Sequence, residues 1–353
     1  MFAQTRRHSN RHWTAEMAYK HGTANSPAAL WNALLAFLKS DPDLVAAGQQ
    51  WTVGWTAPGG EKDGVVLIGP GASGTDSVMV SLRRVDTTGE DTNAIWMRGQ
   101  IGIVDTATTV KQHAGISPEV GIFVDTNPME YWFVASGRRF VVVVKMSTTY
   151  VSLYGGFFLP YANPITYGYP LMIGGSMPYN GDDSSGLQVK SWRDQKAAHS
   201  HFPFSVDLGG NNGIQEDERS SCYLLDNGGQ WRNVGDQLDS AYNVAPYYFR
   251  KEDPSFQNPW LQAEIGSSDA NVGWLFQRQR IEENFGGGFS LEQFQLISTV
   301  GGEQMLGVMD GVFSCPGQGN AAQNIVQIAG VDYLVVQNVF RTDTRQYWAL
   351  RLN

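Results

Sequence analysis

The sequence predicts a mainly β protein of the α+β class, with antiparallel sandwich- or barrel-like sheets, an N-terminal helical hairpin and long loops. Three observations lead to this prediction. Apolar and polar residues alternate over much of the chain from Gln50 onward, which is the period of a half-buried strand. Clear helical spacing occurs between Ser26 and Gly48. The composition combines 40 Gly and 15 Pro with 12% aromatic and 17% charged residues, which is typical of a globular protein with many turns.

Residues 26–48 are predicted to form the helical hairpin. Ser26 can cap a first helix, and Pro27 stands at its first position, where a missing N–H costs nothing. The start signal is repeated at Asp41-Pro42, and Gly48 ends a short second helix. The apolar face, which we expect to cover an open side of the β-domain, consists of Leu30, Trp31, Leu34, Leu35 and Leu38.

A β-domain is predicted to follow, so that residues 26–176 form one unit. Residues 1–25 precede it as a polar, weakly basic arm, which has little reason to order by itself and either docks on a neighbour or frays. The expected strands of the β-domain are Trp51–Thr56, Gly64–Ile68, Ser77–Arg83, Ala94–Ile103, Gly121–Val124, Met129–Ala135 and Arg139–Met146.

The remainder divides into a loop-rich region, residues 177–285, and a C-terminal β region, residues 286–353. Clusters of Gly, Asn, Asp and Ser interrupt the first of these, so we expect extended loops and short strands ordered by subunit contacts. The C-terminal region is expected to pack on the first β-domain, with a hairpin turn at Gly330-Val331-Asp332. Its predicted strands are Gly307–Cys315, Asn324–Ile328, Tyr333–Phe340 and Tyr347–Leu352.

A glycine-rich stretch, Gly69-Pro70-Gly71-Ala72-Ser73-Gly74, fits the G-x-G-x-x-G pattern and follows a predicted strand. A dinucleotide site would require a helix next, because the N–H groups of a helix N-terminus bind the pyrophosphate. Residues 75–82 instead alternate like a strand. We therefore expect a hairpin loop.

No motif assigns a catalytic, cofactor or metal site, and we expect no enzyme. His199 and His201 are expected on one face of an extended segment. A metal site would need a third ligand, for which Asp207 and Cys222 are the candidates, but the spacing of neither residue supports it. The sequence contains neither G-x-S-x-G nor H-E-x-x-H. The acidic pairs and clusters are expected to be solvated turns: Asp182-Asp183, Glu216-Asp217-Glu218 and Glu282-Glu283. The two cysteines, Cys222 and Cys315, are expected to be reduced and partly buried.

The net charge of −9 argues against a general nucleic-acid binder, because a surface that follows phosphates needs excess Lys and Arg. No apolar run reaches the roughly 18 residues of a membrane span, and residues 1–12 lack the apolar stretch of a secretory signal. We expect a protein made and assembled in a cytoplasm, with no membrane and no specific nucleic-acid partner.

The stretch from Tyr131 to Ser176 is rich in aromatic residues and is interrupted by Pro and Gly. Ser136-Gly137 joins two predicted strands, and the segment after them has no helical period. An apolar ribbon of this kind normally lies against another part of the chain or another subunit. The predicted interface residues are Tyr150, Tyr154, Phe157, Phe158, Tyr161, Tyr167 and Tyr169, with Arg138 and Arg139 contacting carboxylates of a neighbour or of the same chain.

Three parts of this sequence resemble a family of tailed-bacteriophage virion structural proteins, and together they cover about half of the chain. Residues 24–56 resemble that family's N-terminal opening, including Leu44-Val45-Ala46-Ala47-Gly48. Residues 131–176 resemble it through Phe157-Phe158-Leu159-Pro160-Tyr161 and Tyr169-Pro170-Leu171. Residues 306–352 resemble its C-terminal end. The resemblance implies a tail or baseplate component without catalytic residues, assembled as a symmetric ring around the tail axis.

These observations together predict a structural subunit of the virion tail, positioned at the baseplate, that binds copies of itself and neighbouring tail proteins. Three alternatives stay open: a carbohydrate-binding module that touches the host surface, an enzyme that degrades envelope polysaccharide or peptidoglycan, and a head–tail connector component. The carbohydrate alternative predicts exposed Trp and Tyr faces. The candidate tryptophans are those at positions 51, 55, 96, 132, 192, 231, 260, 274 and 348.

Overall fold

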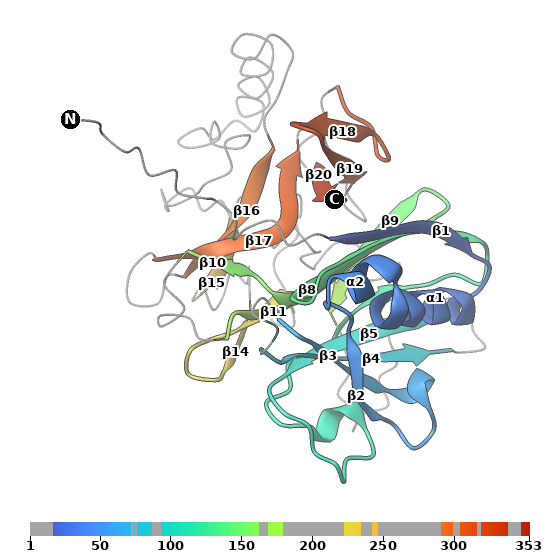
Figure 1. Ribbon diagram of the computed structural model, residues 1–353, viewed down its shortest axis with the longest axis vertical. Coiled ribbons are helices and arrows are strands. Elements are labelled where there is room, and N and C mark those ends of the chain that lie inside the picture. The colour runs from blue at the N-terminus through green and yellow to red at the C-terminus, as the bar shows by residue number, and fades with distance from the viewer. Residues whose placement is uncertain are drawn as a thin grey trace, which may run out of the picture.

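The computed structural model describes residues 17–71, 74, 76–86, 93–161, 169–178, 222–233, 242–245, 291–298, 304–315, 319–337 and 347–353. Antiparallel strands in three sheets make up most of these residues (Figure 1). The predicted mainly β class with antiparallel sheets is therefore confirmed.

The central sheet contains seven strands in the order β1-β7-β8-β9-β11-β13-β14. The two strands predicted around Ser136-Gly137 are its β7 and β8, with the bounds expected from the sequence. The strands are β1 (Ala18–Ala24), β7 (Met129–Ala135), β8 (Arg139–Met146), β9 (Thr149–Phe157), β11 (Leu171–Gly175), β13 (Cys222–Leu225) and β14 (Trp231–Asn233).

The N-terminal sheet contains six strands in the order β12-β6-β5-β4-β3-β2. Its strands are β2 (Thr52–Thr56), β3 (Val65–Gly69), β4 (Val78–Val85), β5 (Ala94–Gln100), β6 (Val120–Phe123) and β12 (Met177–Pro178). Strands β3 and β4 pair antiparallel. The prediction that the glycine-rich stretch forms a hairpin loop is therefore confirmed. Two short 3₁₀ helices, Glu61–Asp63 and Val110–Gln112, lie in the loops of this sheet.

The predicted helical hairpin is confirmed as α1 (Pro27–Ser40) and α2 (Pro42–Ala46). The Ser26 hydroxyl oxygen accepts a hydrogen bond from the Ala29 N–H, and the Asp41 carboxylate accepts one from the Asp43 N–H. Each cap satisfies a backbone donor that has no partner within its helix. Leu30, Leu34 and Leu38 are buried, so the apolar face of α1 lies in the core.

The C-terminal sheet runs in the order β15-β16-β17-β20-β19-β18, with β10 also paired to β17. Its strands are β10 (Leu159–Pro160), β15 (Tyr242–Ala245), β16 (Glu292–Ser298), β17 (Gln304–Cys315), β18 (Ile325–Ile328), β19 (Val331–Gln337) and β20 (Tyr347–Arg351). The predicted hairpin is present, but its turn residues are Ala329 and Gly330. Both have positive φ, as a two-residue turn of type I′ requires.

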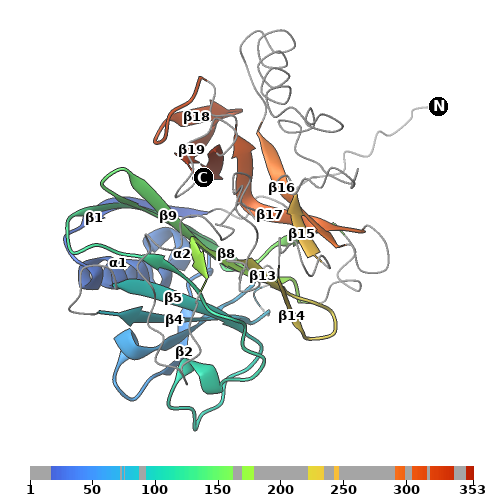
Figure 2. The same ribbon diagram turned by 180° about the vertical axis from the view of Figure 1, so that it is seen from behind.

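The central sheet is covered on both faces. Figures 1 and 2 show the C-terminal sheet on one side and the N-terminal sheet with α1 on the other. Successive side chains of β8 point to opposite faces of the central sheet, and both faces are covered. Phe140, Val142 and Val144 pack against α1 and the N-terminal sheet. Val141 and Val143 pack against the C-terminal sheet. An antiparallel strand buried on both faces reads as a continuous apolar run instead of alternating.

The predicted arm is corrected in part. Residues 1–16 lie outside the described residues, but Ala18–Ala24 form β1 and pair with β7 from Ala18↔Ala135 to Ala24↔Met129. Main-chain hydrogen bonds to a strand more than 100 residues away order this segment. A local reading of its polar composition cannot reveal such a partner.

Candidate interaction surface

The aromatic segment predicted as an interface lies mainly inside the protein. Tyr150, Tyr154, Phe157 and Phe158 are all buried. Tyr150, Tyr154 and Phe158 pack between the central and C-terminal sheets, while Phe157 packs on the opposite face of the central sheet. The interface prediction is therefore wrong for these four residues, because the chain's own sheets cover them.

The hydroxyl groups of this segment are accommodated within the fold. Tyr154 Oη donates to the carbonyl oxygen of Phe157 at 2.8 Å, and burial raises the pKa of Tyr154 well above its ordinary value. Burial, followed by the charges of Glu130 and Tyr347, raises the pKa of Tyr150 to about 12. Both tyrosines are thus held neutral, as expected for phenols in an apolar layer.

The remaining aromatic candidates have different environments. Tyr169 is partly buried, donates its hydroxyl hydrogen bond to the carbonyl oxygen of Ser77, and meets Phe157 edge to face at 4.9 Å. Tyr161 follows β10 and is 54% exposed, so it is the one predicted aromatic interface residue whose side chain is shown at the surface. Tyr167 lies outside the described residues.

Arg138 and Arg139 contact a carboxylate of the same chain. Arg138 Nη2 lies 2.6 Å from Asp310 Oδ2, and Arg139 Nε lies 3.5 Å from the same oxygen. Burial opposes the ionisation of Asp310, but the charges of Arg139 and then Arg138 outweigh it and lower its pKa. This cluster joins β8 of the central sheet to β17 of the C-terminal sheet. It is therefore an internal contact, which is the same-chain alternative of the two expected for these arginines.

Two glycines of β17 lie where neighbouring groups leave no room for a side chain. Gly311 has φ +74°, and a Cβ there would meet the Arg139 guanidinium. A Cβ on Gly307 would meet the carbonyl oxygen of Leu159, in the strand that pairs with β17. Glycine is needed where a backbone has positive φ or approaches another backbone this closely.

A second buried ionic cluster was not predicted from the sequence. The Glu119 side chain is buried and receives two hydrogen bonds of 2.7 Å from Arg83, and Arg98 Nε lies 3.4 Å from it. Burial opposes the charge on Glu119, yet the bonds and charges of its arginine partners lower its pKa. The ion pairs of Glu119 with Arg83 and Arg98 hold the loop before β6 against β4 and β5. All three residues come from separate segments, so no local motif marks them.

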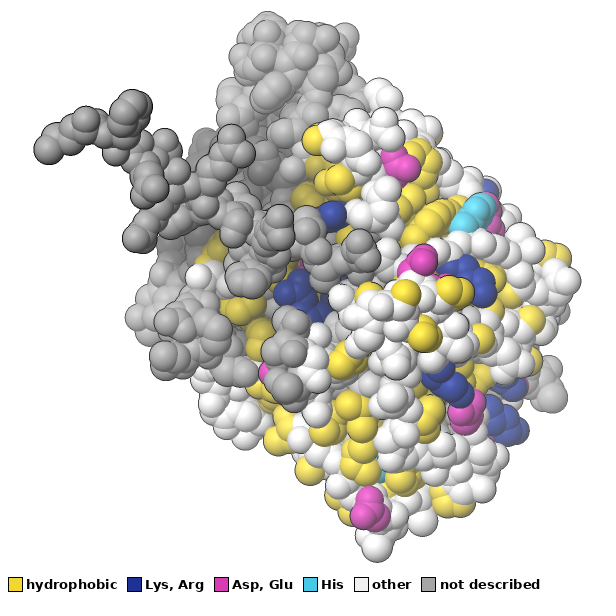
Figure 3. Space-filling model, viewed as in Figure 1, with side chains coloured by type: hydrophobic (Ala, Val, Ile, Leu, Met, Phe, Trp, Pro, Cys, Tyr) yellow, Lys and Arg dark blue, Asp and Glu magenta, His cyan; other side chains and the backbone are white. Residues whose placement is uncertain are grey.

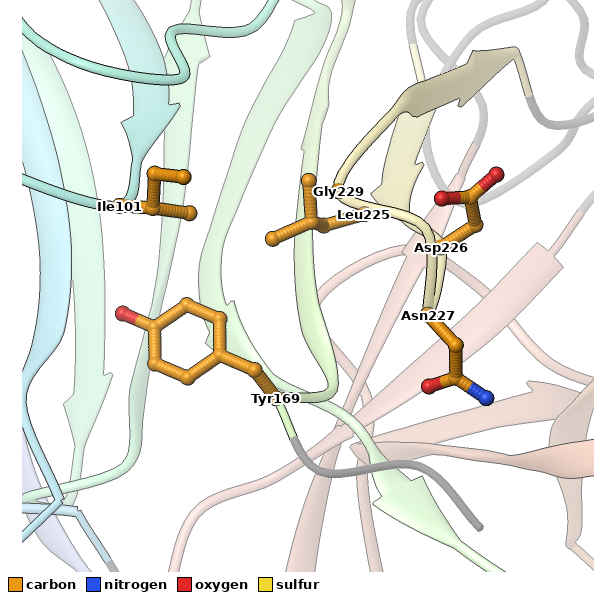
Figure 4. Close-up of a pocket in the computed structure, with 6 residues that line it drawn as sticks. All are labelled: Ile101, Tyr169, Leu225, Asp226, Asn227 and Gly229. Carbon is orange, nitrogen blue, oxygen red and sulfur yellow. The ribbon is translucent and has the colours of Figure 1, made fainter.

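A recess of about 360 Å³ lies where the β13–β14 hairpin approaches the loop after β5. Figure 4 shows Leu225 directed toward Ile101 and Tyr169, whereas the Asp226 and Asn227 side chains extend away from them. Asp226 Oδ1 also accepts hydrogen bonds from the N–H groups of Gly228 and Gln230. The apolar side chains thus face the recess, and the carboxylate closes the hairpin turn.

In the described residues, the tryptophan side chains do not form an exposed platform on which a sugar could stack. Trp51, Trp96, Trp132 and Trp348 are buried, and Trp231, which is partly buried, donates from Nε1 to the carbonyl oxygen of Gly115. Trp55 meets His113 edge to face. Trp192, Trp260 and Trp274 lie outside the described residues.

The histidines considered as metal ligands, with one of their two candidate third ligands, and the acidic residues expected in solvated turns all lie outside that part of the chain. These are His199, His201, Asp207, Asp182, Asp183, Glu216, Asp217, Glu218, Glu282 and Glu283. In the ranges that the structure describes, no group of three His, Cys, Asp or Glu side chains could hold a metal ion. Cys222 and Cys315 are buried and unbridged.

Some exposed apolar side chains lie at sheet edges, and others, such as Val45 on α2 and Ile101 after β5, lie elsewhere on the surface. Val53 of β2 is 37% exposed, and Ile325 and Ile328 of β18 are 53% and 37% exposed. Figure 3 shows apolar side chains at the surface where β18 and β19 lie. An exposed strand edge also presents unpaired main-chain groups. Strand β18 is therefore the candidate interaction surface that the sequence reading missed.

No family model matches this chain, and no curated protein matches it. Among the described residues, no helix combines the length and apolar character needed to cross a membrane.

Proposed function

We propose that this chain is a structural subunit of a bacteriophage tail, positioned at the baseplate, that binds copies of itself and neighbouring tail proteins. The proposal starts from the sequence resemblance of residues 24–56, 131–176 and 306–352. These three segments contribute to α1, the central sheet and the C-terminal sheet, which share two apolar cores. The segments that carry the resemblance therefore belong to the elements that form the apolar cores of the molecule.

The structural observation that carries an assembly role is the exposed, apolar edge of the C-terminal sheet at β18. Such an edge favours pairing with another chain unless charge, proline or a bulge opposes it. A structural subunit of a symmetric assembly uses contacts of this kind in every copy. No cofactor is part of the proposal.

The proposed location has a direct test in purified virions. Antibody-gold labelling and mass spectrometry should find multiple copies of the chain on the tail, with labels at the baseplate end. Labels at the junction between head and tail would support the connector alternative instead. Absence of the chain from virions, together with a monodisperse monomer at all concentrations, would contradict the proposal.

A further inference from the structure

The connection between β5 and β6 is a long loop, residues 101–119, whose two arms are joined at two levels. Figure 1 shows it at the lower end of the molecule, next to β2. At its base, Gly102 and Ala114 form an isolated antiparallel bridge. Farther along the loop, the Val104 N–H donates to Nδ1 of His113 at 3.1 Å. The His113 side chain therefore closes the tip of the loop.

The hydrogen bond from Val104 requires a neutral imidazole. Nδ1 can accept only when it carries no proton, so the proton of the neutral ring is on Nε2. His113 is 5% exposed, and its Nε2 is buried without a hydrogen-bond partner in the described part of the chain. Protonation would replace the acceptor by a donor that faces the Val104 N–H. It would also place a charge where almost no water reaches.

Among the described residues, no charged side chain bonds to the His113 ring. Its ring partner is Trp55 of β2, edge to face at 4.6 Å between ring centres, and β2 contains no charged residue. Asp105 of the loop is exposed, and Lys111 has the same sign of charge as an imidazolium. Burial alone therefore acts on His113, and it lowers the pKa of the imidazole.

The surrounding elements hold no carboxylate ready to pair with a protonated ring. Their charged residues are exposed or form ion pairs with other residues: Glu61, Lys62 and Asp63 in the loop before β3, and Arg83, Arg98 and Glu119 near the ends of the β5–β6 loop. Charging His113 in the closed loop would therefore have a desolvation cost that no opposite charge offsets.

The tip that His113 closes covers apolar groups of the N-terminal sheet. Val110 lies in the tip and is 3% exposed. A Cβ on Gly64 would meet Val110 Cγ1 at 2.8 Å and the Trp55 ring at 3.3 Å, so these side chains pack closely over the loop before β3. Opening the tip would expose Val110 and Trp55 to water.

We propose that His113 is a pH-sensitive switch: protonation of its ring breaks the hydrogen bond from Val104 and opens the tip of the β5–β6 loop, while the three sheets stay folded. In the open form the imidazole reaches water, so that form binds the proton more readily than the closed form. The closed tip is therefore fully stable above the ordinary pKa of about 6.5 and loses stability as the pH falls below it. This inference is independent of the proposed tail function.

Hydrogen–deuterium exchange of the full-length chain at pH 7.5 and pH 5.5 tests the switch, with each rate divided by the intrinsic rate at that pH. Protection of the Val104 amide should fall by at least about threefold, within the limit of about tenfold that a group of pKa 6.5 permits at pH 5.5. The amides of β8 should remain protected. Equal protection of Val104 at both pH values would overturn the proposal. An equal loss in Val104 and β8 would also overturn it, because the whole protein would then be unfolding.

The variant H113N removes the titration and keeps an acceptor. The asparagine side-chain oxygen can take the place of Nδ1, and it does not titrate in this range. Protection of Val104 in H113N should therefore be the same at pH 7.5 and pH 5.5. H21N is the matched control, because the half-exposed His21 pairs with Glu130 at 2.8 Å on another sheet. A pH-dependent loss in H113N equal to that of H21N would show that His113 is not the switch.

A measurement on the unaltered protein keeps the test decisive if H113N does not close at pH 7.5. In an NMR titration, the ring resonance of His113 and the amide resonance of Val104 should change together, with one midpoint below pH 6.5. Protonation of His113 without a change at Val104 would contradict the proposal.

Discussion

The aromatic segment of β9 and the edge strand β18 are both apolar and extended, yet they occupy opposite environments. Tyr154 and Phe158 lie between two sheets, whereas Ile325 is 53% exposed. The aromatic segment has the greater apolar area, so it would be the more costly of the two to leave in water. The difference shows that apolar content alone does not identify an interface. The decisive property is whether the same chain supplies a covering layer.

The sharpest test of this comparison uses two aromatic residues that lie three positions apart. F158A should lower the free energy of unfolding by about 3–5 kcal/mol, because it opens a cavity between the two sheets. Y161A should lower it by less than about 1 kcal/mol, because its side chain is 54% exposed. Urea unfolding followed by far-UV circular dichroism measures both. Equal small effects would mean that position 158 is not in the core.

A comparable effect is expected where the central sheet joins the C-terminal sheet. D310A should lower the free energy of unfolding by about 3–5 kcal/mol, because it leaves Arg138 and Arg139 without their carboxylate in a buried site. D86A is the matched control, since the Asp86 side chain is 46% exposed in its pair with Arg84. This control should cost less than about 1 kcal/mol. If both variants unfold at the same urea concentration, the contact of Asp310 with the two arginines does not stabilise the protein as proposed.

The contact of Asp310 with the two arginines should also affect the stability of the protein at low pH. The folded pKa of Asp310 is lowered, so its ionisation stabilises the protein above the unfolded pKa of about 3.8. This contribution is lost as the pH falls below that value toward the folded pKa. Wild type should therefore lose more unfolding free energy than D310A between pH 5 and pH 2. Parallel pH profiles of the two proteins would contradict this.

A smaller, alkaline effect is expected at Tyr150. Its folded pKa of about 12 exceeds the ordinary value of 10, so folding favours the neutral phenol. The associated stability is complete below pH 10 and is lost as the pH rises through 12. Y150F should reduce the alkaline loss of unfolding free energy by up to about 1 kcal/mol per pH unit. The check is urea unfolding at pH 9, 10 and 11, with Y161F as the control for an exposed tyrosine.

The smallest effect on stability is expected at the open edge. I325K should change the free energy of unfolding by less than about 0.5 kcal/mol, because the side chain is already half in water. Its effect should appear in association between copies instead. A thermal melt and a sedimentation measurement on the same sample separate the two properties. A large loss of stability without a change in association would place Ile325 in the core of the single chain.

The elements with strong local signals could be predicted from the sequence. Ser26-Pro27 marks the start of α1, and the bounds of β7 and β8 follow from their apolar pattern on either side of Ser136-Gly137. The hairpin of β18 and β19 was also expected, although its turn lies at Ala329-Gly330. These features depend on interactions within a few residues.

The contacts between distant segments could not be predicted. Arg138 meets Asp310 across 172 positions, and β1 is ordered by β7. A short apolar run such as Ile325–Ile328 reads the same whether it is buried or lies at an edge. Its exposure depends on the end position of β18 in the sheet, which no local pattern specifies.

Hydrogen–deuterium exchange at two protein concentrations tests the central comparison most directly. The amides of β9 should be strongly protected at both concentrations, because the single chain covers them. The amides of Ile325 and Gln327, which face the open edge, should exchange rapidly in dilute protein and become protected in concentrated protein. The account would be contradicted if β9 gained protection with concentration while Ile325 and Gln327 remained unprotected.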